Sequence, residues 1–166
     1  GGDYAMGMIL TLAQLSPRAG AELGASPDAD ARFEIMDAGV DLDKAWHGIH
    51  FMLAGEAWGG AMPAATLLLG GRELGEDFVG YGPARLLSPS EVSSFNDYLV
   101  ALTKDAFDAR FNAQAMIDAK IYPDIWERDL NGEPDGRPYM KEYFSILKEY
   151  VAAAAQSNAA MLITIS

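Results

Sequence analysis

Length, composition and charge limit the classes to which this chain can belong. Its 166 residues suit one domain with a core large enough to fold without disulfides or metals. The chain has no cysteine, which excludes disulfides, thiolate nucleophiles and cysteine-ligated zinc or iron–sulfur clusters. The formal charge of −12 repels phosphate backbones and anionic lipids, so we expect no nucleic-acid or membrane partner.

Continuous apolar runs near both ends of the chain predict two buried strands. Residues 6–13 lack helical spacing, are too short to cross a membrane, and have no basic residue before them, unlike a signal peptide. Residues 161–165 form a second run, and residues 84–87 are a weaker third candidate. Such runs are typical of strands covered on both faces, so we expect the two terminal strands in one sheet. Residues 1–5 are expected to be a leader outside the domain.

Serine–proline pairs predict where helices begin. They stand at residues 16–17, 26–27 and 88–89, where the serine hydroxyl can cap the first turn and proline has no N–H to lose. The third pair is the strongest, because Glu91 follows Ser88 by three residues and completes a capping box. We expect helices over residues 16–23, 26–38 and 88–102, one from Asp41 or Asp43 to Gly55, and others over residues 105–110, 112–119, 123–129 and 138–155.

Glycine is concentrated between residues 55 and 83, which hold eight of the 17 glycines. Large apolar and aromatic side chains lie between them, so we expect a compact irregular surface and not a linker. This segment should fold back onto the helix that ends at Gly55. With strands at both ends and helices between, the pattern predicts a single α+β domain over residues 6–166, in which several helices pack on a small mixed sheet.

Four segments carry a resemblance to a known family. They are MGMI at residues 6–9, LDKAWHGIHFML at 42–53, YGPARLLSP at 81–89 and IYPDIWERD at 121–129. In this order they resemble the YfbM-like family, a domain of unknown function, and the likeness runs from Met6 to the last strand. The resemblance implies an α+β fold and a bacterial, cytoplasmic protein, but no reaction. An acid commonly stands at the position of His47 in the family pattern, which argues against His47 as a ligand or base.

The two histidines of the chain, His47 and His50, are three residues apart on one expected helix. Neighbours at that spacing can share a metal, but no third ligand is specified beyond Asp43 or Glu56. Helical geometry places His50 at the flank of the apolar face and His47 nearer the polar side. We therefore expect no metal site. His50 alone suits the edge of a pocket, as a hydrogen-bonding group.

The sequence lacks the common catalytic and cofactor motifs. The stretch from Gly80 to Gly82 has neither the later glycine nor the following helix of a dinucleotide fingerprint, and no glycine precedes Lys-Ser or Lys-Thr. A serine hydrolase would need a Gly-x-Ser-x-Gly elbow, which is absent. Paired carboxylates of a glycosidase come from distant segments, so spacing alone does not decide about them. We expect no cofactor.

Aromatic and polar side chains in or beside the family-like segments are the best candidates for binding residues: His50, Trp58, Tyr81 and Arg85. Aromatic walls with a few polar groups form ligand pockets and interaction hot spots, and equally a core with ion pairs at its edge. In the pocket alternative, the glycine-rich segment lines the main concavity near His50. A carboxylate would then hold Arg85, with its fork open to an acidic ligand group.

The sequence supports two functional hypotheses. The first is a binding or interaction module without chemistry, which engages a protein partner or a small ligand. The second is a small-molecule enzyme of the hydrolase type with a site near His50 and Arg85. A deep pocket that holds either residue beside a perturbed carboxylate favours the enzyme, and a flat apolar patch favours the module.

Overall fold

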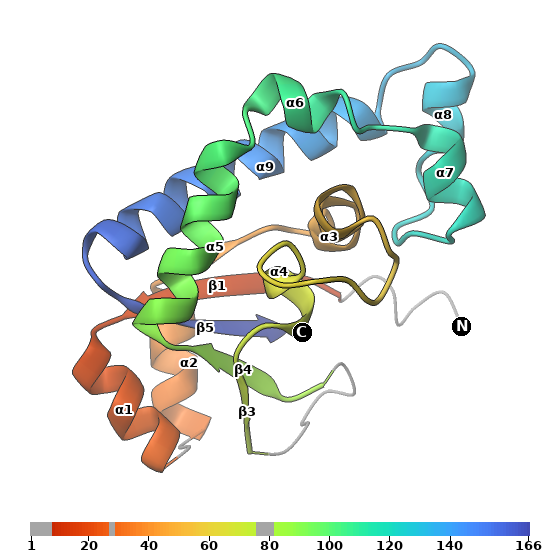
Figure 1. Ribbon diagram of the computed structural model, residues 1–166. Helices are drawn as coiled ribbons and strands as arrows, with labels where there is room; N and C mark the ends of the chain where they lie inside the picture. Colours follow the sequence, from red (N-terminus) through yellow and green to blue (C-terminus); the bar gives the residue numbers. More distant parts are fainter. Residues whose placement is uncertain (1–7, 27–28, 76–81) are drawn as a thin grey trace.

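A computed structural model describes residues 8–26, 29–75 and 82–166 of the chain (Figure 1). It has three layers, with a five-stranded sheet between two layers of helices. Figure 1 shows α1 and α2 on one side of the sheet and α3, α5 and α9 on the other. The predicted α+β class is confirmed.

The sheet brings the two ends of the domain together. Its strands are β1 (Leu10–Leu15), β2 (Val40–Asp41), β3 (Arg72–Leu74), β4 (Ala84–Leu87) and β5 (Ala160–Ile165), in the spatial order β2-β1-β5-β4-β3. The strands β1 and β5 pair along their whole length, from Leu10 opposite Ile165 to Leu15 opposite Ala160. The prediction that both terminal strands lie in one sheet is therefore confirmed. Every pairing is antiparallel, so this sheet is not mixed.

Nine helices are described, and most lie where capping and apolar spacing predict them. They are α1 (Pro17–Ala25), α2 (Ala29–Asp37), α3 (Trp46–Ala54), α4 (Thr66–Leu69), α5 (Pro89–Ala101), α6 (Lys104–Asp108), α7 (Ala113–Asp118), α8 (Glu127–Leu130) and α9 (Gly136–Gln156). The Ser16 hydroxyl accepts from the Ala19 N–H, and Ser88 and Glu91 form the expected capping box. Ser26 follows α1 as its C-cap, whereas Pro27 of the proposed Ser26-Pro27 cap and residues 6 and 7 of the first expected strand lie outside the described residues.

The expected start of the third helix was wrong. Asp41 and Asp43 both precede α3, which begins at Trp46. Asp43 has a φ of 50°, a left-handed conformation that a helix cannot contain, and its N–H donates to the Asp41 carboxylate at 2.9 Å. These two acids therefore form a turn that leads from β2 into α3.

Alternate residues of the inner strands enter two separate cores. Leu86 and Leu162 pack with α1 and α2, whereas Leu87, Met161 and Ile163 pack with α3, α5 and α9. A strand buried on both faces carries apolar residues at every position, because neighbouring side chains point to opposite faces. The continuous apolar runs in the sequence follow from this arrangement.

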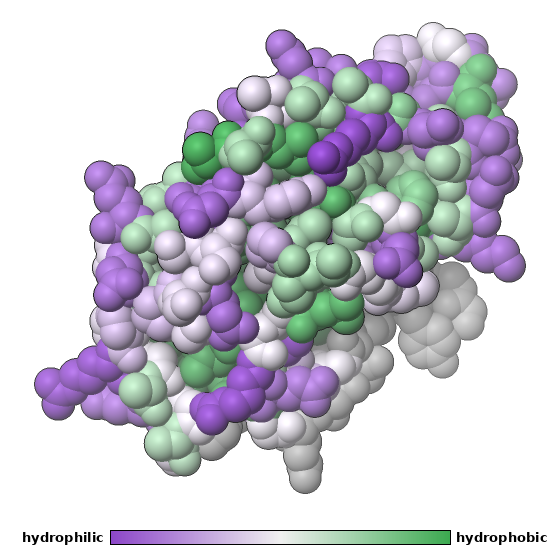
Figure 2. All heavy atoms as spheres, in the orientation of Figure 1, coloured by the Kyte–Doolittle hydropathy of each residue, from purple (hydrophilic) through white to green (hydrophobic). Residues whose placement is uncertain are grey.

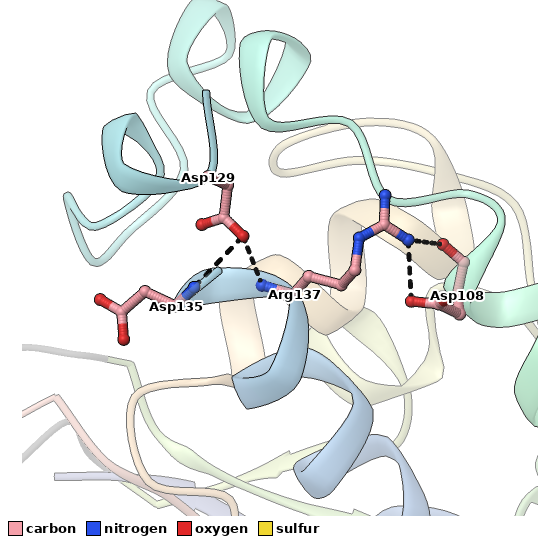
Figure 3. Close-up of polar contacts among 4 residues, drawn as sticks. All are labelled: Asp108, Asp129, Asp135 and Arg137. Atoms are coloured by element: carbon pink, nitrogen blue, oxygen red, sulfur yellow. Dashed lines mark hydrogen bonds and ion pairs between the residues drawn. The ribbon is translucent and has the colours of Figure 1, made fainter. Parts of the chain in front are cut away.

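The amino terminus of α9 is held by a carboxylate from another helix (Figure 3). Asp129 of α8 accepts N–H bonds from Gly136 at 2.8 Å, from Arg137 at 3.0 Å and from Asp135 at 3.4 Å. The first N–H groups of a helix have no partner within it, and a negative charge there is favoured. Arg137 in turn donates to the carboxylate and the backbone carbonyl of Asp108, which joins α9 to α6.

Replacement of Asp129 by alanine should lower the free energy of unfolding by about 1–2 kcal/mol, because it removes the acceptor for three N–H groups. Urea unfolding measures this loss. Asp135 is the matched control: it occupies the cap position, but its side chain makes no capping bond and its ion pair with Arg128 is exposed. An equal or larger loss for Asp135→Ala would contradict this account.

Candidate functional site

Both histidines of α3 are fully buried, with exposed fractions of 0%. The expectation that His47 lies nearer the polar side was wrong. Helical periodicity describes only the helix itself, whereas the face that carries His47 is covered by the loop after α3, around Ala57, and by a distant segment around Tyr122. Neither side chain is exposed at the edge of a pocket.

The hydrogen bonds define the form of each imidazole ring. The Nδ1 atom of His47 accepts from the Tyr122 N–H at 2.9 Å, so its Nε2 carries the proton and donates to the Ala57 carbonyl at 2.8 Å. The Nε2 of His50 donates to the Gly59 carbonyl at 2.9 Å. Its Nδ1 is buried and has no hydrogen-bond partner among the described residues. The two bonds of His47 require a neutral ring, and burial lowers the pKa of both histidines, which favours the neutral form of each.

The bonds from the two histidines to the carbonyls of Ala57 and Gly59 fix the loop that carries Trp58. The histidines hold the carbonyls of residues 57 and 59, and the side chain between them lies against His47, with ring centroids 4.1 Å apart. Trp46 is adjacent, 6.3 Å from the Trp58 ring and 5.4 Å from His47. Trp58 nevertheless remains 58% exposed. A large aromatic surface is therefore open to solvent on a loop that is tied to the core.

A pocket of about 340 Å³ lies beside this aromatic cluster. Its walls come from α3, the loop after it, α4, and the adjoining ends of β3, β4 and β5. The lining residues are Met8, Trp46, Trp58, Leu68, Glu73, Gly82, Pro83, Arg85, Ile163, Thr164 and Ile165. Of the four predicted site residues, the pocket brings together Trp58 and Arg85. His50 is buried and is not a lining residue, and Tyr81 falls outside the described residues.

Arg85 is held by backbone carbonyls, and the expected carboxylate partner was wrong. Its two terminal nitrogens donate to the carbonyls of Thr66, Leu67 and Gly70 at the carboxyl end of α4. Burial lowers the pKa of Arg85 to about 10, and the charge of Glu73, its neighbour across β3 and β4, opposes that shift. The guanidinium therefore stays charged at neutral pH, with its terminal nitrogens already engaged.

Two parts of the pocket were not predicted from the sequence: the contribution of the end of β5 and the carboxylate of Glu73. Residues 163–165 were correctly expected to form a strand, but only the β4–β5 pairing shows that their end borders Arg85. Glu73 stands on β3, a three-residue strand that was not predicted. Its opposite charge to Arg85 was visible in the sequence, although the register that pairs them was not.

No group of three or more histidine, aspartate or glutamate side chains in residues 8–26, 29–75 and 82–166 is placed to hold a metal ion. A shared metal at His47 and His50 would also displace the bonds to the Ala57 and Gly59 carbonyls or to the Tyr122 N–H. Metal independence stays a prediction.

The protein is an α+β domain with helices on both faces of an antiparallel sheet and a pocket at one end of that sheet. The model of the family described as "Domain of unknown function (DUF1877)" matches residues 6–164, and the chain belongs to this family. The structure is similar to that of YfbM from Escherichia coli, a protein of unknown function. The TM-score is 0.72 at 20% sequence identity, with 96% of this chain and 100% of the other covered. No curated protein matches the sequence.

We expect the stability of the protein to fall between pH 7.5 and pH 5.5. Burial lowers the pKa of both histidines, so the unfolded chain takes up protons near its ordinary pKa of about 6.5 while the folded protein does not. Stability is therefore full above that pKa and decreases as the pH falls through it, by up to about 1.4 kcal/mol for each histidine over this range. Urea unfolding at pH 7.5, 6.5 and 5.5 measures the slope.

The double variant His47→Gln, His50→Gln provides the comparison, because glutamine can donate to the same carbonyls but does not titrate. Its slope should be clearly flatter than that of the wild type. Equal slopes would show that other groups cause the dependence.

The position of Arg85 predicts a structural contribution. Replacement by alanine should lower the free energy of unfolding by about 2–3 kcal/mol, because three buried carbonyls lose a charged donor. Arg18 serves as the control, since its single ion pair, with Glu22, is exposed to solvent. Arg18→Ala should change the urea midpoint little, and an Arg85→Ala loss below about 1 kcal/mol would contradict the anchoring role.

Proposed function

We propose that this chain is a binding module without catalytic chemistry, which engages a protein partner or a small ligand through the pocket beside Trp58. The observation that carries the proposal is that Trp58 is 58% exposed although its loop is fixed by two buried histidines. An exposed aromatic ring on a rigid support loses little conformational freedom when it binds, and such residues dominate binding energy at interfaces.

The geometry gives the hydrolase hypothesis less support. A general base must reach its substrate within hydrogen-bond distance, directly or through one water. His50 is fully buried with its Nε2 bonded to Gly59, and the terminal nitrogens of Arg85 are engaged by α4. Among the described residues that line the pocket, Glu73 is the one carboxylate. A single acid without a positioned nucleophile suits recognition better than hydrolysis.

Charge and composition support the expected place of action and the class of partner. A cysteine-free chain suits the reducing cytoplasm of a bacterium, and a charge of −12 disfavours nucleic acid and anionic lipid as partners. Among the helices of the described segments, none has the length and apolar character needed to cross a membrane. We include a cytoplasmic location in the proposal.

A quantitative capture experiment tests the proposal. The immobilised wild-type protein and two variants, Trp58→Ala and Phe33→Ala, are exposed to lysate of the source bacterium, and bound molecules are compared by mass spectrometry. Phe33 is the matched control, because it is 67% exposed on α2, in the other helical layer. We expect a species that wild type and Phe33→Ala retain unaltered and Trp58→Ala loses.

The Trp58 variant should remain folded, because loss of an exposed ring costs well under the roughly 3 kcal/mol or more of a core tryptophan. A thermal melt checks this point. Identical bound species for wild type and folded Trp58→Ala would refute the role of the pocket, and turnover of a bound molecule would refute the absence of catalysis.

A further inference from the structure

The chemistry of the pocket beside Trp58 indicates what kind of group it can accept. The lining includes the 58% exposed ring of Trp58, with the buried ring of Trp46 beside it, and Glu73 is exposed among the lining residues. An aromatic face attracts a cation electrostatically, and Arg, Lys or ligand cations occupy such positions in proteins. A carboxylate in the same pocket adds an opposite charge to which the cation can bond.

Arg85 does not make the pocket a site for an anion. Its terminal nitrogens point to the carbonyls of Thr66, Leu67 and Gly70, where its positive charge meets the negative end of α4. Glu73 lies opposite it across the strand pair, so the two lining charges cancel. The net charge of the chain, −12, then sets the sign of the long-range field, and that field attracts cations.

The size and surroundings of the pocket suit a side chain with an apolar stem. A volume of about 340 Å³ is small for a ligand pocket, whose range is roughly 300–1,000 Å³. Figure 2 shows hydrophobic surface over α4. Leu69 of α4 is 46% exposed, and Met62, in the turn before α4, is 52% exposed. Arginine and lysine carry long aliphatic stems that cover such surface while the charged end binds elsewhere.

We propose that this pocket takes the arginine or lysine side chain of a partner protein, with its charged end over the Trp58 ring and paired with Glu73. The inference rests on the proposed function, because it names the ligand class of the same site. It implies an acidic module that recognises a basic segment of its partner, with rapid, salt-sensitive association.

The indole N–H signals in a nitrogen-15 NMR spectrum give a direct test. The chain has three tryptophans, so three signals are expected, and the spectrum of Trp58→Phe identifies the one that belongs to Trp58. The other two indole groups donate to the carbonyls of Met8 and Ile121 at 2.9 Å. The probes are N-acetyl-arginine amide, its uncharged isostere N-acetyl-citrulline amide, and N-acetyl-glutamate amide.

The shift of the Trp58 signal with probe concentration gives a dissociation constant, which we expect to be at least about tenfold lower for the arginine probe than for the citrulline probe. The glutamate probe should leave the signal unchanged. Glu73→Gln should weaken arginine binding by about tenfold, whereas Glu149→Gln, the same charge change at an exposed site on α9, should not. Added salt should weaken binding further.

Three outcomes would overturn the inference. If the citrulline or glutamate probe bound at Trp58 more tightly than the arginine probe, the cationic ligand would be refuted, but the proposal of a binding module would remain. If Glu73→Gln and Glu149→Gln weakened arginine binding equally, the effect would come from the net charge of the protein and not from a contact with Glu73. No shift of the Trp58 signal with any probe would reject the arginine or lysine ligand, and the capture experiment with Trp58→Ala would then decide separately about the pocket.

Discussion

The hydrogen bonds of His47 are the interaction on which the candidate site depends. One imidazole ring joins α3 to the loop that follows it and to a segment 75 residues away, because its Nε2 binds the carbonyl of Ala57 and its Nδ1 binds the N–H of Tyr122. Only the neutral ring with its proton on Nε2 can make both bonds. The orientation of Trp58, and with it one wall of the pocket, therefore depends on the protonation of a buried histidine that does not itself line the pocket.

Three basic side chains of this acidic protein bind helix ends. Arg85, Arg110 and Lys148 each donate to backbone carbonyls at the carboxyl ends of α4, α3 and α5. These carbonyls have no partner within their own helix, and positive charge is favoured beside them. In the part of the helix-rich layer that the structure describes, cations bound to helix ends thus join neighbouring elements, in addition to the Arg137–Asp108 ion pair. Arg85 follows this pattern, which is why the expected carboxylate partner of Arg85 was wrong.

Local signals predicted the local structure well, and the site depended on contacts that they do not contain. The Ser88–Glu91 capping box located α5, and continuous apolar runs located β1 and β5. The position of His47 was misjudged because its cover comes from residues 57 and 122, which no helical wheel includes. Short elements such as β3 and α4 lack room for any periodic pattern, so Glu73 and the partners of Arg85 were missed.

The position of β5 has a consequence for how the chain folds. This strand is the last element in chain order, yet it lies between β1 and β4 and completes both cores. Until it is synthesised, β1 and β4 each expose an unpaired, apolar edge, and the contacts that close the sheet span nearly the whole domain. Folding of the domain should therefore be slow, because long-range strand pairing must form first. Truncation before residue 160 should leave an aggregation-prone chain instead of a smaller stable domain.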